Sequence, residues 1–458
     1  MADRYLIAGG QIISGSGSRT ADILIDNGRI EKIGEDLADM TARRIDASGK
    51  LIFPGFIDAH THFDLEVSDT VTADDFESGT KAAIAGGTTC IIDFATQYKK
   101  EALSEALATW HKKADGVCSS DYAFHMAISD WNENTAEEIK EMFAGGVTSF
   151  KLYMTYDIRV SDGVIYDILK KMKAVGGIVG VHCENNDLIN RLAGEQKSAG
   201  DYSPAAHPKS RPACAEAEAI HRLLTIARVV DVPVMIVHLS SEEGYEEVRR
   251  ARERGQKVYT ETCPQYLILD ESRYQLEDFE GAKYVCSPPL RSRQDKECLW
   301  QAVRDGQIDT ISTDHCSFTM AQKKMGIKDF TKIPNGMPGV GNRPQLIYTY
   351  GVLEDRMTVS QMCRLLSENP AKLYGMYPRK GCIAEGSDAD IVIWNPDYRR
   401  TITAEGQLYR TDYNPYEGIK VRGMAERVFL RGMPVAEKGE VTKPNTGCYI
   451  KREKGIRI

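Results

Sequence analysis

The stretch LIFPGFIDAHTHFD, from Leu51 to Asp64, begins as an apolar run and ends in two histidines that are one residue apart. A continuous apolar run of this kind is typical of a strand that is buried on both faces. Residues i and i+2 of a strand point to the same side, so His60 and His62 should project together and could bind one ion. Taken alone, the pair is equally consistent with two hydrogen-bonded histidines in a packed core.

Seven more apolar runs follow, and helical patterns of about 10 to 15 residues separate them. The eight runs cover residues 51–60, 88–94, 122–128, 148–154, 177–184, 233–240, 256–263 and 308–315. Alternating βα units predict a parallel sheet, and eight units predict a closed (β/α)8 barrel of the α/β class, with its active site where the strands end. An open doubly wound sheet is the competing fold, but no Gly-x-Gly-x-x-Gly motif opens a helix early in the chain.

Both ends of the chain have the pattern of short strands joined by tight turns. ADILIDNGRIEKIG alternates around Asn27-Gly28, which is a strong hairpin signal. SDADIVIWNPDY and ERVFLRGMPVAEKGEV have the same texture near the C-terminus. We therefore expect residues 1–53 and 379–458 to form one small β-sandwich-like domain, with the barrel, residues 54–378, inserted between them.

Composition excludes several classes of protein. A chain of 458 residues with 42% apolar and 27% charged residues is an ordinary globular protein, long enough for a barrel and a smaller domain. A net charge of -8 with scattered basic residues gives no reason to expect nucleic acid or an anionic membrane as partner. No secretory signal or membrane-spanning run is recognised, and the 11 cysteines contain no Cys-x-x-Cys pair, so we expect a cytoplasmic protein with reduced thiols.

Other metal-capable side chains lie at or near the ends of later runs: Lys151, His182, His238 and Asp314. Because the strand ends of a barrel meet at one mouth, we expect these side chains to converge on the His60 pair. As a ligand, Asp314 would be ionised and could also carry a proton, although an N-cap of the following helix is an alternative role. Three further candidates fit core or supporting hydrogen bonds better: His125, His315 and Glu261. The thiols of Cys263 and Cys316 could ligate zinc in principle.

Lys151 is the most informative of these residues. In TSFKLYM (148–154), alternation turns Phe150 and Leu152 outward and Lys151 inward, where a buried ammonium is costly unless it is paired or neutralised. One interpretation is an ion pair with Asp314 or Glu184. The other is a neutral amine that has captured carbon dioxide as a carbamate, an anionic group whose two oxygens can bridge two divalent ions.

These motifs give the chain a family resemblance. It resembles the amidohydrolase superfamily and, within it, the D-hydantoinase and dihydropyrimidinase family. The similarity extends over the whole length through GFIDAHTHFD, SFKLYMTY, VHCEN, IVHLS, ETCPQYL, SPPLR, STDHCSF, IPNGMPGVGNR and GSDADIVIWNP. The resemblance implies a cyclic amidohydrolase that opens a hydantoin or 5,6-dihydropyrimidine ring to an N-carbamoyl amino acid.

The resemblance also implies a binuclear metal site. One ion would be held by His60, His62, Asp314 and carbamylated Lys151, and the second by His182, His238 and the same carbamate. Family members usually contain zinc, and manganese or cobalt is also accepted. They are commonly homotetramers.

Substrate contacts follow from the same resemblance. Asp314 would transfer the proton, and Tyr156 would hydrogen-bond the ring carbonyl as charge develops. Ser287 and Asn335 would hold the amide edge of the ring through backbone groups. Three further residues would shape the pocket for the ring substituent: Leu65, Val67 and Tyr153. Packing for Tyr156 and a simple Asn-Gly turn at Asn335 are the alternatives.

Related functions are less consistent with the sequence. Dihydroorotases usually follow the His-x-His with an Arg that binds a carboxylate, and allantoinases follow it with an Asn, whereas Phe63 and Asp64 stand here. A phosphotriesterase-like hydrolase would lack the terminal motifs and SPPLR. A non-catalytic scaffold of the same fold would have lost metal ligands, and this chain retains all six candidates. A metal-storage or sensor protein would have no reason to resemble a substrate-binding set.

Overall fold

Each of the eight predicted runs contributes a strand to one parallel sheet in the computed structural model, which describes residues 4–67, 69–456 and 458. In sheet order the strands are β6 (Phe56–Thr61), β9 (Thr88–Thr96), β10 (Asp121–Ala127), β11 (Ser149–Tyr153), β12 (Ile178–His182), β13 (Val234–Ile236), β14 (Val258–Thr262) and β15 (Thr310–Ile311). A parallel bridge between Thr61 and His315 returns the chain beside β6 and nearly closes the sheet. The predicted (β/α)8 barrel is confirmed.

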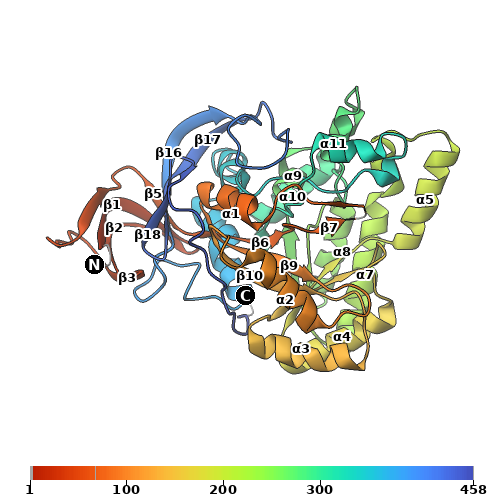
Figure 1. The fold of residues 1–458 in the computed structure, drawn as a ribbon, viewed down its shortest axis with the longest axis horizontal. Helices are drawn as coiled ribbons and strands as arrows, with labels where there is room; N and C mark the ends of the chain where they lie inside the picture. The colour runs from red at the N-terminus through yellow and green to blue at the C-terminus, as the bar shows by residue number, and fades with distance from the viewer. Residues whose placement is uncertain (1–3, 68, 457) are drawn as a thin grey trace.

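Helices cover the outside of this barrel (Figure 1). The longer ones are α1 (Phe76–Ala85), α2 (Leu103–Ala114), α3 (Glu133–Gly145), α4 (Asp162–Val175), α5 (Asn186–Ser198), α7 (Ala213–Val230), α8 (Glu242–Glu253) and α10 (Arg293–Arg304). Short helices include α6 (Ala206–Ser210), α9 (Pro264–Ile268), α11 (Met320–Lys323), α12 (Arg343–Ile347), α13 (Val359–Cys363) and α14 (Asn369–Leu373). Phe150 and Leu152 of β11 share a buried cluster with Ile168 of α4, which confirms their predicted outward direction.

Strands from both ends of the chain form a second, mixed sheet. Its members are β1 (Tyr5–Ser14), β2 (Gly17–Asp26), β3 (Arg29–Gly34), β4 (Arg43–Asp46), β5 (Leu51–Pro54), β16 (Ile391–Thr401), β17 (Lys420–Leu430), β18 (Met433–Glu437) and β19 (Glu440–Val441). The two ends join where β5 pairs antiparallel with β16, and Figure 1 shows the N-terminal and C-terminal strands side by side. The predicted hairpin is confirmed between β2 and β3, with positive φ at Asn27 and Gly28. The boundaries at residues 53 and 379 remain predictions.

The apolar run 51–60 is divided between the two sheets. Leu51–Pro54 forms β5 of the terminal sheet, and Phe56–Thr61 forms β6 of the barrel. Gly55 lies between them and packs so closely on β9 that a Cβ would lie 2.0 Å from the Thr89 Oγ1. The prediction of a single strand over residues 51–60 is therefore wrong. The run instead forms two strands and carries the chain from one domain into the other.

The barrel interior is filled below the strand ends. Ile57, Ala59 and Met235 pack there with Tyr374 and with Ile450 of the C-terminal tail. The tail is held like an extra strand, because the Ile450 amide donates to the Tyr122 carbonyl at 2.7 Å. The polar residues at the C-terminal strand ends therefore face the other end of the barrel. Within the described residues, none of the helices has the length and apolar character needed to cross a membrane.

Candidate active site

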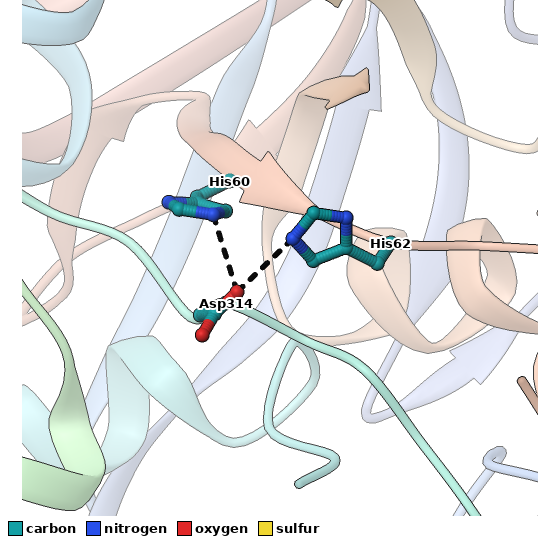
Figure 2. A group of neighbouring side chains, drawn as sticks. All are labelled: His60, His62 and Asp314. Atoms are coloured by element: carbon teal, nitrogen blue, oxygen red, sulfur yellow. Dashed lines mark ion pairs between the residues drawn. The ribbon is translucent and has the colours of Figure 1, made fainter. Parts of the chain in front are cut away.

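Figure 2 shows three side chains that meet beyond the ends of β6 and β15: His60, His62 and Asp314. The Nε2 atoms of His60 and His62 lie 3.1 and 3.2 Å from the same Oδ1 of Asp314. One donor atom from each of the three residues lies within 4.8 Å of the others. Strand alternation thus places both rings on one side, as the sequence predicts. Two imidazoles and a carboxylate at this spacing can hold a divalent cation.

Glu261 fixes the orientation of His60. The Nδ1 of His60 lies 2.5 Å from Oε1 of Glu261, at the end of β14, and both side chains are buried. With its proton on Nδ1, bonded to Glu261, the ring can offer the Nε2 lone pair to a cation held beside Asp314. This carboxylate–histidine pairing is the usual support of a metal-ligating imidazole, and Glu261 has the supporting position that the sequence suggests.

His182 and His238 form a second group beside the first. Their ring centres are 4.5 Å apart, and the ring of His238 lies 5.5 Å from that of His60. The Nε2 of His182 is 2.7 Å from Oε2 of Glu184, which leaves its Nδ1 available. The Nδ1 of His238 is buried and has no hydrogen-bond partner among the described residues. All four predicted histidines therefore converge at the barrel mouth.

Lys151 lies between these two groups. It is fully buried, its Nζ lies 3.4 Å from Nε2 of His60, and its ammonium sits 4.9 Å from the centre of the Phe94 ring. Within the described chain, no carboxylate oxygen lies within ion-pair distance of it, so the ion pair with Asp314 or Glu184 is not formed. An unpaired ammonium here is costly, because the nearby charges of Asp314 and Glu261 offset its lost hydration only in part.

The surroundings favour the protonation states that metal binding requires. Burial lowers the pKa of His62 to about 4 and that of His238 well below its usual value. Burial also lowers the pKa of Lys151 to about 8. Burial opposes ionisation of Asp314, yet the neighbouring His60 ring brings its pKa well below the usual range. Neutral His62 and His238 rings and an ionised Asp314 are the ligand forms of these groups, whereas the Glu261 and Asp314 carboxylates raise the pKa of His60 despite its burial, so this ring must lose a proton to bind a cation.

Three residues of this region have an unusual backbone conformation. Tyr156, His238 and Asp314 have φ values of +71°, +40° and +53°. A positive φ is uncommon for residues other than glycine, and it costs roughly 1–3 kcal/mol where the surrounding structure enforces it. These are three of the 14 described non-glycine residues with positive φ, and each of them follows a barrel strand.

The candidate substrate residues surround the same mouth. The ring of Tyr156 lies 5.3 Å from that of His182, and burial raises the pKa of its phenol to about 12, so it keeps its proton and can donate it in a hydrogen bond. Ser287 lies beside this phenol. Asn335 is half-buried, and its neighbour Gly336 donates its amide to the Val285 carbonyl at 2.9 Å, which joins the Asn335 and Ser287 loops.

The three pocket-shaping candidates occupy two elements. Leu65 precedes a small hairpin of β7 (Glu66–Val67) and β8 (Thr70–Val71), and Val67 lies in its first strand. Tyr153 is the last residue of β11, whereas an origin in the loop after the fourth strand would be expected for a residue that shapes the pocket. Because Tyr153 is two residues from Lys151, it points the same way, and its ring lies 5.2 Å from the Lys151 Nζ.

His125 and His315 make core hydrogen bonds, as the sequence suggests. His125 contacts Ser149 and the Ala59 carbonyl through its two ring nitrogens. The Nε2 of His315 lies 3.1 Å from Oδ2 of Asp74. Neither ring joins the group formed by the other four histidines.

Sequence reasoning missed a buried ion pair next to the site. Nη1 of Arg211 lies 2.5 Å from Oε2 of Glu184, and the guanidinium centre is 5.3 Å from the Tyr156 ring. Glu184 therefore links His182 to an arginine that packs on Tyr156. The position of Glu184, two residues after His182, is a signal for a shared direction. Arg211 has no such local signal, because it follows a short helix remote from any strand end.

The arrangement of barrel, terminal sheet and polar mouth is shared with known proteins. The model of the Amidohydrolase family matches residues 51–435. The chain belongs to the amidohydrolase family. A D-hydantoinase of Geobacillus stearothermophilus is 43% identical to this amidohydrolase over 454 residues, which cover 98% of the chain and 96% of that protein.

Two further relatives extend the comparison. A D-phenylhydantoinase of Escherichia coli O1:K1 / APEC is 39% identical over 457 residues, or 98% of each protein. The crystal structure of dihydropyrimidinase from Brevibacillus agri NCHU1002 superposes with a TM-score of 0.98 at 40% identity, covering 99% of this chain and all of that one. The resemblance inferred from the sequence motifs is thereby confirmed over the full length.

Proposed function

We propose that this amidohydrolase opens the ring of a cyclic amide, a hydantoin or a 5,6-dihydropyrimidine, and releases an N-carbamoyl amino acid. The observation that carries the proposal is the convergence of four histidines, a buried lysine and an aspartate at one end of the barrel. The names of the three relatives refer to hydantoins or dihydropyrimidines, and those proteins match nearly the whole chain. This supports the same substrate class here.

The donor set fits two divalent ions per subunit. His60, His62, Asp314 and Lys151 would hold one ion, and His182, His238 and Lys151 the other, with Lys151 converted by carbon dioxide to a carbamate. Imidazole and carboxylate donors suit zinc, and they also accept manganese or cobalt. When bound, the ions would lower the pKa of an attacking water and polarise the ring carbonyl.

The chain's own residues supply the remaining steps. Ionised Asp314 can accept the proton of the attacking water and pass it to the departing ring nitrogen. The phenol of Tyr156 donates a hydrogen bond to the carbonyl oxygen on which negative charge develops. Backbone groups at Ser287 and Asn335 hold the amide edge of the ring, so that the carbonyl carbon faces Asp314.

Substrate preference provides a direct test. Leu65, Val67 and Tyr153 offer a largely apolar boundary, so hydantoins with a bulky or aromatic 5-substituent should be accepted. Initial rates of metal-replete protein would be compared on hydantoin, 5-phenylhydantoin, dihydrouracil, allantoin and dihydroorotate. We expect 5-phenylhydantoin or dihydrouracil to exceed allantoin and dihydroorotate by at least about tenfold in kcat/KM. Turnover confined to allantoin would contradict the proposal.

Glu261→Gln tests the support of His60. The neutral amide of Gln lacks the negative charge that accepts the His60 Nδ1–H in the wild type. The metal affinity of the site should therefore fall by roughly 10- to 100-fold. Metal retained per chain would be measured after graded exposure to a chelator. The matched control is Glu277→Gln at an exposed glutamate. Equal metal retention in both variants would show that Glu261 does not support metal binding.

Two alternatives make different predictions. An allantoinase-type enzyme would share the metal ligands and differ in substrate, which the rate comparison resolves. A non-catalytic scaffold would purify without bound metal and hydrolyse no cyclic amide. Phe63, at the position where dihydroorotases usually carry Arg, is fully buried against Phe76 and the His315 ring and cannot bind a carboxylate.

Assembly and location belong to the same proposal. A homotetramer in the cytoplasm is the expectation from the family. Light scattering should give four times the chain mass of 51.0 kDa.

A further inference from the structure

Lys323 is a fully buried lysine outside the metal-binding group. It is the last residue of α11, and its Nζ donates to three main-chain carbonyl oxygens: Val285 at 2.9 Å, Pro334 at 2.7 Å and Gly336 at 2.8 Å. Within the described residues, no carboxylate lies within ion-pair distance of this nitrogen. A neutral amine has only two N–H donors, so three carbonyl acceptors at these distances require the ammonium form.

Burial of an ammonium in this position is energetically unfavourable. Burial lowers the pKa of Lys323 to about 7, since the protein interior replaces water around the charge. Its other neighbours offer no negative charge: the Phe318 ring lies 5.5 Å away, and burial raises the pKa of the nearby Cys286 thiol to about 12. An apolar side chain of similar size would avoid this cost, so the three charge-assisted hydrogen bonds point to a function for the cation.

The three carbonyls belong to the two loops that carry candidate substrate contacts. Val285 is two residues before Ser287, and Pro334 and Gly336 flank Asn335. The loops also contact each other, because the Gly336 amide donates to the same Val285 carbonyl. Gly336 has a φ of +151°, and a Cβ there would lie 2.3 Å from the Cys316 carbonyl oxygen. The two loops therefore meet in a narrow space, with the Lys323 ammonium at their junction.

We propose that Lys323 is a positioning residue that clamps the Ser287 and Asn335 loops, so that their backbone groups present a preformed edge to the substrate ring amide. This role rests on the proposed function. The adjacent Gln322 extends it, because its side-chain amide donates to the Thr70 hydroxyl and to the Val71 carbonyl of the β7–β8 hairpin. Helix α11 thus connects three segments that border the substrate pocket.

The clamp itself is tested without any assay of activity. Lys323→Met removes the charged donor and keeps an unbranched side chain that is one heavy atom shorter, and Lys324→Met is the matched control at the exposed neighbouring lysine. Hydrogen–deuterium exchange would be compared for peptides covering residues 284–291 and 330–338. We expect faster exchange in both peptides for Lys323→Met only, with the barrel strands unchanged. Unchanged exchange in both loops would overturn the clamp.

The positioning role is tested by steady-state kinetics. Because the clamp acts on groups that bind the ring rather than on the groups that transfer the proton, Lys323→Met should raise KM by about tenfold or more and change kcat by less than about threefold. Metal content per chain should equal that of the wild type. Faster exchange with an unchanged KM would show that the clamped loops do not position substrate, and would overturn the proposal.

Two further outcomes can be distinguished from a failure of the clamp proposal. If Lys323→Met does not fold, Lys323→Gln provides the same comparison, since its amide retains two donors and should give intermediate exchange and an intermediate KM. If the wild-type enzyme turns over no cyclic amide, the proposed function fails, and the exchange experiment still decides whether Lys323 clamps the loops.

Discussion

Lys151→Ala is expected to abolish hydrolysis of cyclic amides. Lys151 is fully buried between the His60 and His182 groups and would supply the anion shared by both ions. Its loss should lower kcat/KM on the order of 10³-fold or more, beyond the 10²- to 10³-fold cost of losing one oxyanion donor. Activity and metal bound per chain would both be measured, and both should fall together.

Chemical rescue distinguishes the carbamate from a structural lysine. The substitution leaves space for a small anion at the site, so acetate or propionate should partly restore activity and metal binding in Lys151→Ala. Lys140→Ala, at an exposed lysine that pairs only with Glu137, should respond to neither treatment. Undiminished activity in Lys151→Ala would reject the carbamate, and so would a folded, metal-replete variant that stays inactive in the presence of these acids.

Most of the barrel could be predicted because the sequence patterns that determine its strands are local. Each strand is a short apolar run, and alternation within the run sets the direction of every side chain. For this reason the directions of Phe150, Lys151 and Leu152 followed directly from TSFKLYM. The predicted domain boundary fell within LIFPGFIDAH, but the break between two strands at Gly55 could not be predicted, because the contact that requires glycine there is made by Thr89, which is distant in the sequence.

The convergence of the four histidines was predictable to the same extent. His60, His62, His182 and His238 lie at strand ends, so a general property of barrels brings them together. Lys323 and Lys324 show where this reasoning stops. They are adjacent residues of the same type, yet one is fully buried on three carbonyls from other loops and the other is exposed. Only the tertiary contacts distinguish them, as they do for Arg211 beside Glu184.

Asp314→Asn is expected to lower kcat by roughly 10²- to 10⁴-fold, the usual contribution of a positioned general acid–base. The amide has nearly the same shape but cannot accept a proton from water or return one to the ring nitrogen. It also removes the negative charge that both His60 and His62 contact within 3.2 Å. Metal content measured on the same samples would separate lost proton transfer from lost binding of a cation.

A matched control exists for the strained backbone at this position. Asp278 has the same φ of +53° and is exposed, so Asp278→Asn makes the same chemical change in the same conformation at a residue outside the candidate site. Asn tolerates this conformation as readily as Asp, so neither substitution should alter the backbone. We therefore expect wild-type kcat for Asp278→Asn. A merely twofold loss in metal-replete Asp314→Asn would remove this carboxylate from proton transfer, because the barrier it is proposed to lower would then be nearly unchanged.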